Sequence, residues 1–157
     1  KRISGYPGHT GNYFAPAVAL GLAIGRLGCF LTEPPGRATS LPWGIHSDPR
    51  AEYLLPYCPP CQQGLAMHPS FLYEIAFLVL CLWLMRKYRH IFSAPGSLFI
   101  AFLATYSVFR FFIEFTRGNT VNSWGLTGSQ VFLLVVLPLI LWRLRAGLRP
   151  AEREMRT

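Results

Sequence analysis

The sequence predicts an all-α polytopic membrane protein, a helix bundle with about four transmembrane helices and one long outer loop. Of its 157 residues, 52% are hydrophobic and only 14% are charged, a composition that does not suit a soluble domain. Four mostly apolar stretches are each long enough to cross the roughly 30 Å hydrocarbon core of a bilayer. The basic residues are unevenly distributed between these stretches, as membrane topology requires.

The predicted spans are residues 13–31, 70–88, 96–115 and 126–144. Pro69 stands where the second helix is expected to begin, and Gly96 opens the third. Residues 32–69 are rich in Pro and Gly, and they predict an ordered outer loop with a short strand pair near residues 42–46.

The whole chain, residues 1–157, is treated as a single membrane domain, and its last segment, residues 145–157, is expected to be a loose, basic, cytoplasmic tail. The sequence opens with Lys1 and not with Met. We therefore expect the chain to be the later part of a longer protein.

The net charge of +8 could suggest a nucleic-acid partner, but the positions of the basic residues indicate membrane topology instead. Of the 15 Lys and Arg residues, ten lie in three segments on one predicted side of the membrane and two lie on the other. The ten are Lys1, Arg2, Arg86, Lys87, Arg89, Arg143, Arg145, Arg149, Arg153 and Arg156, and the two are Arg37 and Arg50. This imbalance predicts cytoplasmic termini and outward-facing loops at residues 32–69 and 118–125.

Three arginines, Arg26, Arg110 and Arg117, lie within or at the ends of the apolar helices. An Arg at the centre of a spanning helix costs about 2.5–3.5 kcal/mol on insertion scales. Such a residue is therefore expected to have an ion-pair partner or a functional role. Helical spacing places Arg110, Glu114 and Arg117 on one stripe with Tyr106.

Acidic and other polar residues stand near these arginines. Cys29 and Glu33 share a face with Arg26 if the first helix persists that far. Tyr73 and Glu74 lie close to the outer end of the second span, just after His68. All of these side chains could converge on one site in the outer half of the bilayer.

Two interpretations of this site stay open. In the first, Arg110 pairs with Glu114 and Arg26 pairs with Glu33 only to neutralise charge and hold the bundle together. In the second, the arginines bind an anionic ligand and the glutamates orient them, because a guanidinium offers a fixed fork of donors that matches a phosphate. In a membrane, that phosphate would belong to a phospholipid headgroup.

Four segments make the second interpretation more specific. They are GRLGCF (residues 25–30), GR (36–37) with LPWG (41–44), HPSFLYE (68–74) and RFFIEFTR (110–117), in this order. Together they resemble the bacterial prolipoprotein diacylglyceryl transferase family, over nearly the whole chain but only the later half of that family's usual length.

The resemblance implies an enzyme that transfers a diacylglyceryl group from phosphatidylglycerol to the lipobox cysteine thiol of a prolipoprotein, in the bacterial inner membrane. Phosphatidylglycerol, the lipobox peptide and membrane lipid would be its partners, and no nucleic acid, metal or cofactor is expected. The implied catalytic residues are Arg26, Glu33, His68, Arg110 and Glu114. The implied substrate-binding residues are Arg26, Cys29, Tyr73, Glu74, Arg110 and Arg117.

The chain also departs from the family pattern. Cys29 stands where the family usually has Asn, and an upstream His-Gly-Gly segment is missing, since His9 is followed by Thr10 and Gly11. The chain is then either a fragment or a divergent relative. A noncatalytic phospholipid-binding membrane module is the alternative function.

Cys58 and Cys61 form a CxxC pair in the outer loop. A disulfide that staples the loop is the expected state in an oxidising compartment. A redox-active pair and a metal site are the alternatives, and a membrane thiol protein built on this pair is a third hypothesis for the function.

Overall fold

The computed structural model describes residues 11–33, 35–46, 63–92, 94–119, 121–122 and 124–154, with side chains up to residue 145. Its elements are α1 (Gly11–Thr32), β1 (Ile45–His46), β2 (Ala66–Met67), α3 (Ser70–Tyr88), η1 (Arg89–Ile91), α4 (Ser97–Ile113), η2 (Glu114–Thr116) and α5 (Gly128–Glu154). The expected Cys58–Cys61 pair lies outside the described residues.

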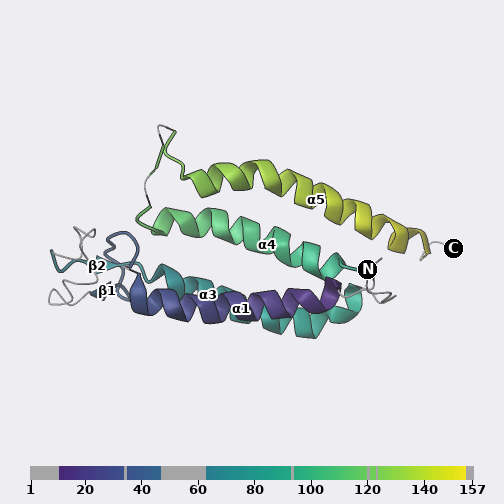
Figure 1. Ribbon diagram of the computed structural model, residues 1–157, viewed down its shortest axis with the longest axis horizontal. Coiled ribbons are helices and arrows are strands. Elements are labelled where there is room, and N and C mark those ends of the chain that lie inside the picture. The colour runs from purple at the N-terminus through teal and green to yellow at the C-terminus, as the bar shows by residue number, and fades with distance from the viewer. Residues whose placement is uncertain are drawn as a thin grey trace, which may run out of the picture.

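The four α-helices run side by side along the long axis of the molecule (Figure 1). α1 packs against both α3 and α4, whereas α5 packs against α4. The loop between α1 and α3 and the loop between α4 and α5 lie at one end of the bundle. We call this the loop end and the opposite one the turn end, because the tight α3–α4 turn lies there.

The predicted fold class is confirmed. Three helical segments of the described chain are long and apolar enough to cross a membrane: Gly11–Thr32, Ser97–Thr116 and Gly128–Arg145. The fourth helix, α3, has 19 residues and begins at Ser70, as expected. It carries Glu74 near one end and Arg86 and Lys87 near the other.

Small residues allow α1 to approach its neighbours closely. Ala15, Ala19 and Ala23 are buried on one face of α1, against a core that includes Leu78 of α3 and Phe102 of α4. Because a short side chain lets two helix backbones come together, this stripe explains the dense packing of the three-helix core. Most large side chains of α5 are exposed, as is usual for a helix whose outer face meets lipid.

One local expectation was right only in part, and a second was wrong. The strand near residues 42–46 does form, as β1, but it pairs with β2 across the long loop, with Ile45 opposite Met67. The backbone after residue 144 is helical as far as Glu154 and not a loose tail, because each residue added to an existing helix gains a backbone hydrogen bond.

Candidate phosphate-binding site

Glu74 joins three parts of the bundle at the loop end. Its side chain is only 1% exposed, and its Oε1 accepts a hydrogen bond of 2.6 Å from the Tyr106 hydroxyl on α4. Its Oε2 lies 2.8 Å from Nε of Arg26 on α1 and 4.0 Å from Nη1 of Arg117. Because a buried carboxylate is costly unless paired, the contact with Arg26 offsets the cost of burying Glu74.

Glu114 is the second buried carboxylate of the site. Its Oε2 lies 2.6 Å from Nη1 of Arg110, one turn earlier on the same helix. Its Oε1 accepts hydrogen bonds from Asn119 Nδ2 at 2.6 Å and from Ser129 Oγ, on α5, at 2.9 Å. The expected Arg110–Glu114 pair therefore exists. Asn119, in the loop between α4 and α5, and Ser129, on α5, fix the Glu114 carboxylate by donating to its other oxygen.

The expected pairing of Arg26 with Glu33 is wrong. The Glu33 N–H still donates to the Cys29 carbonyl at 2.8 Å, but Glu33 stands seven residues, roughly 10 Å of helix, beyond Arg26, whereas Glu74 lies beside the guanidinium. Glu33 instead lies 3.5 Å from Nη2 of Arg117 and is 47% exposed. An ion pair this long and this exposed contributes little to stability.

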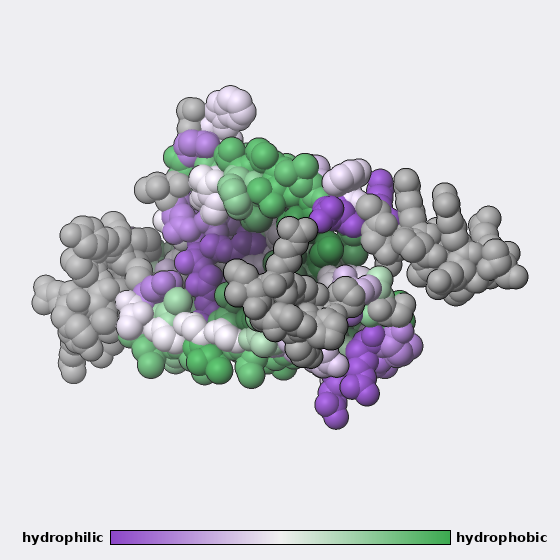
Figure 2. All heavy atoms as spheres, turned by 45° about the vertical axis from the view of Figure 1, so that its right-hand side comes forward, coloured by the Kyte–Doolittle hydropathy of each residue, from purple (hydrophilic) through white to green (hydrophobic). Residues whose placement is uncertain are grey.

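The three arginines are partly exposed. Arg26, Arg110 and Arg117 each have 18% of their side chain exposed. A guanidinium has five N–H donors, and the ion pairs occupy only some of them. In Figure 2, hydrophilic residues gather in a strip between two apolar surfaces of the bundle.

A second polar group lies at the mouth of the site. The Trp43 indole donates a hydrogen bond of 2.8 Å to the Tyr73 hydroxyl, and the Tyr73 oxygen lies 3.3 Å from Nδ1 of His68. The Tyr73 hydroxyl can donate to Nδ1 or accept from it, depending on the His68 tautomer. Tyr73 therefore fixes the position of the His68 ring at the mouth of the site.

Backbone contacts fix this mouth to the end of α4. Arg37 N–H donates to the Thr116 carbonyl at 2.8 Å, and Gly36 N–H donates to the His68 carbonyl at 2.8 Å. A Cβ atom on Gly36 would lie only 2.1 Å from the Thr116 oxygen. Only glycine allows the two backbones to approach this closely.

Cys29 and Cys81 occupy different environments. Cys29 Sγ lies 3.5 Å from Nη1 of Arg26, so the thiol contacts the site as a weak hydrogen-bond partner. Cys81 is buried in the core cluster on α3 and takes no part in the site. Among the described residues, no group of three or more His, Cys, Asp or Glu could hold a metal ion.

Sequence reasoning missed the residues that support Glu114 from α5. Thr127 Oγ1 lies 2.9 Å from Ser129 Oγ, which donates to Glu114. Thr127 and Gln130 also form a reciprocal capping box, with N–H donors at 2.9 and 3.3 Å from the two side-chain oxygens. The T-x-x-Q pattern before an apolar run was the available signal.

The fold and the site together define a helical membrane protein with a charged, partly open site at one end of the bundle. Residues 7–144 match the family model described as prolipoprotein diacylglyceryl transferase, and the chain belongs to this family.

Curated relatives of the chain carry the same description. One is the phosphatidylglycerol–prolipoprotein diacylglyceryl transferase of Thermosynechococcus vestitus, 37% identical over 136 residues, which cover 83% of this chain and 48% of the relative. Another, from Methylobacillus flagellatus, is 34% identical over 148 residues, covering 88% of this chain and 51% of the relative. The chain thus spans about half the length of these relatives.

Proposed function

We propose that this chain provides the phosphate-binding part of a phosphatidylglycerol–prolipoprotein diacylglyceryl transferase. One observation carries the proposal: two buried glutamates hold Arg26 and Arg110 at one end of the bundle while 18% of each arginine side chain stays open to the surroundings. A buried ion-pair network needs no such opening if its only task is to neutralise charge. Membership of the transferase family, together with relatives named for phosphatidylglycerol, supports the phosphate of that lipid as the anion.

The reaction joins the cysteine sulfur of the prolipoprotein to the terminal glycerol carbon of the diacylglyceryl group. The thiol proton passes to a base, the thiolate attacks the carbon that carries the phosphate, and the carbon–oxygen bond breaks. Its electron pair leaves with glycerol phosphate. Donors aimed at the phosphate stabilise the negative charge that develops there.

Each residue of the site has a separate role in binding the phosphate or in orienting the groups that bind it. Arg26 and Arg110 bind the phosphate through their open N–H groups, and Glu74 and Glu114 orient them. Arg117 and its partner Glu33 border the site. His68, positioned by Tyr73 at the mouth of the site, donates a hydrogen bond to the phosphate. Because Glu74 and Glu114 are each paired with an arginine, neither is a suitable base for the thiol.

The distribution of basic residues supports a location of this chemistry on the outer side of the bacterial inner membrane. The termini and the α3–α4 turn carry the excess of basic residues, so the turn end faces the cytoplasm. The loop end, with the arginines, faces outward, where a translocated prolipoprotein would meet it.

The test is lipid binding to the purified chain, compared between the wild type, Arg26→Lys and Arg110→Lys. Native mass spectrometry in phosphatidylcholine nanodiscs with increasing phosphatidylglycerol gives the relative affinity. We expect each variant to lose about ten-fold or more, equivalent to about 1.4 kcal/mol, because lysine keeps the charge but not the bidentate fork. Arg143→Lys, at the turn end of α5, is the matched control and should bind as the wild type does.

Unchanged phosphatidylglycerol affinity in both site variants would leave only a structural ion-pair network. Normal binding, without diacylglyceryl transfer to a lipobox peptide, would favour the noncatalytic module. Transfer is best assayed with this chain joined to the unmatched part of a curated relative.

A further inference from the structure

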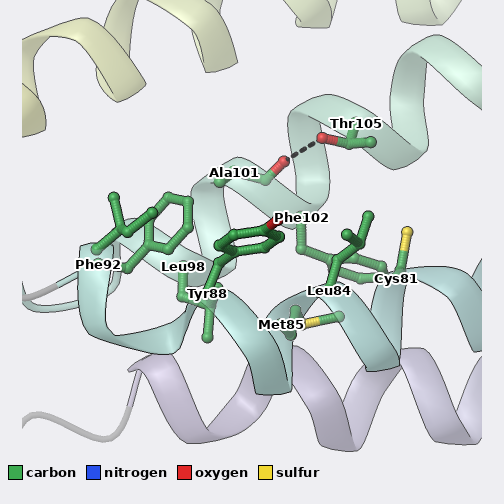
Figure 3. A pocket seen from close by; sticks show the side chains of 10 residues that line it. Cys81, Leu84, Met85, Tyr88, Phe92, Leu98, Ala101, Phe102 and Thr105 are labelled. Carbon is green, nitrogen blue, oxygen red and sulfur yellow. Dashed lines mark hydrogen bonds between the residues drawn. The ribbon is translucent and has the colours of Figure 1, made fainter.

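A cavity of about 290 Å³ lies between the second half of α3 and the first half of α4, near the turn end (Figure 3). Its floor is buried, with Phe102 4% and Leu98 8% exposed, whereas Ile91 at its rim is 59% exposed. The lining is almost wholly apolar, and the Thr105 hydroxyl that borders it already donates to the Ala101 carbonyl at 2.9 Å. The cavity therefore suits a hydrocarbon chain and offers little to a polar ligand.

The cavity is also deep enough along the bundle to hold part of an acyl chain. Its lining extends along α3 from Cys81 to Tyr88, which is roughly 10 Å of helix at 1.5 Å per residue. Figure 3 shows Met85, Tyr88 and Phe102 bordering it from both helices. It opens at the turn, where Ile91 and Phe92 complete the lining.

Four exposed basic or histidine side chains lie next in sequence to the lining residues Met85, Tyr88 and Ile91: Arg86, Lys87, Arg89 and His90. We call them the inner basic turn. Lys87 Nζ lies 5.3 Å from the ring centroid of Tyr88, which lines the cavity. The charged group and the apolar cavity are therefore adjacent.

The inner basic turn has no acidic neighbour in the described parts of α4 and of the turn-end halves of α1 and α3. The sequence contains no Asp or Glu before Glu33 and none between Glu74 and Glu114, so α4 and the turn-end halves of α1 and α3 supply no carboxylate. Among the described side chains, none of the four forms an ion pair with a carboxylate. An anionic ligand would supply the missing charge.

The turn is held in place from α1. Asn12 Nδ2 donates to the carbonyls of Phe92 and Ala94 at 3.1 and 3.2 Å, and Asn12 Oδ1 accepts from the Leu98 N–H at 3.2 Å. The opening of the cavity is therefore preformed, which lowers the entropy cost of binding there.

We propose that the cavity and the inner basic turn form a second phospholipid site, which takes an acyl chain of a lipid with an anionic headgroup from the leaflet at the turn end. This site is separate from the arginine site at the loop end and does not depend on the transfer reaction. An acyl chain occupies the cavity while the headgroup phosphate meets the inner basic turn.

The test uses phosphatidylglycerol with a photoactivatable diazirine near the methyl end of one acyl chain, at low abundance in phosphatidylcholine nanodiscs that contain the full chain. Crosslinked peptides are mapped by mass spectrometry. We expect labelling at the cavity lining, and at least about five-fold less of it when Arg86, Lys87 and Arg89 are all replaced by Gln. Ala101→Phe and the milder Ala101→Leu, which fill the cavity, should reduce labelling without touching any charge.

Two controls separate this site from other lipid contacts. Replacement of Arg143 and Arg145 by Gln removes charge from the same end of α5 and should leave labelling of the cavity unchanged. Arg26→Lys should also leave it unchanged, so the two lipid sites can fail independently. The proposal is overturned if the amount of labelling at the cavity lining is the same in the wild type, the charge variant and the cavity variants. It is also overturned if labelling spreads evenly over exposed positions such as Val79 and Leu139. Crosslinks between two chains through this cavity would overturn it in favour of a protein partner.

Discussion

Nε of Arg26 on α1 lies 2.8 Å from Oε2 of Glu74 on α3. The same carboxylate accepts the Tyr106 hydroxyl of α4, so one side chain connects the three helices of the core at the loop end. Since Glu74 is 1% exposed, water cannot replace either partner. Bundle stability and the orientation of Arg26 therefore depend on the same contact.

The first prediction is that Glu74→Gln lowers both stability and affinity for phosphatidylglycerol. Glutamine keeps the shape of the side chain but leaves Arg26 without its carboxylate. Breaking a buried pair in this way costs about 3–5 kcal/mol, measurable as the free energy of unfolding in mixed micelles. Glu33→Gln is the control, because Glu33 is 47% exposed. Equal stability of the two variants would show that Glu74 does not hold the bundle together.

The sequence predicted the contacts that depend on one helix and missed those that depend on two. Arg110 and Glu114 pair as expected because η2 continues α4 directly and the two residues are four apart. Arg26 pairs with Glu74 because a neighbouring helix places that carboxylate beside it, whereas Glu33 lies about two helical turns further along the chain. The spacing along a helix gives the face of a residue, but not which neighbouring helix covers that face.

The second prediction concerns the capping box at the start of α5. Thr127→Ala and Gln130→Ala should each lower stability by about 1 kcal/mol, because each leaves an N–H at the helix start without its partner. The double variant should lose less than the sum, since the two bonds form one reciprocal unit. Thermal unfolding checks this, with Thr32→Ala as the control because its exposed hydroxyl bonds only within its own helix. Additive losses would contradict a shared unit.

The third prediction is that Gly36→Ala disturbs the mouth of the site. A Cβ atom there would lie 2.1 Å from the Thr116 carbonyl oxygen, so the loop must move away from the end of α4. We expect a loss of about 1–3 kcal/mol, as for other overpacked sites, together with weaker lipid binding. Gly118→Ala is the matched control, because nothing lies within 4 Å of its added Cβ. A Gly36→Ala protein with wild-type melting temperature and affinity would refute the close approach.

The fourth prediction concerns topology. In a background in which the four native cysteines are replaced by Ser, a cysteine at Ser40 should react with a membrane-impermeant maleimide in intact cells. A cysteine at His90 should react only after the cells are opened. Both positions are exposed, so access through the membrane is the only difference. Reaction at His90 but not at Ser40 in intact cells would invert the orientation.

The last prediction concerns Cys29, which stands beside Arg26 where the resemblance implies Asn. Its sulfur lies 3.5 Å from Nη1 of Arg26, and a thiol is a weaker hydrogen-bond partner than an amide oxygen. If this position orients Arg26 for the phosphate, Cys29→Asn should raise the affinity for phosphatidylglycerol several-fold. The same change should raise diacylglyceryl transfer to a lipobox peptide, measured as added mass, when the chain is joined to the unmatched part of a relative.

Cys29→Ser and Cys29→Ala separate orientation from packing. Serine keeps a small polar group beside Arg26, and alanine removes it, so an orienting role predicts that affinity falls in the order Asn, Ser, Ala. If Cys29 is only a small packing residue, Asn should instead lower the melting temperature with no gain in binding, because an amide would then be buried without a partner. That result, with Ala binding lipid as tightly as the wild type, would remove Cys29 from the phosphate site and leave Glu74 alone to orient Arg26.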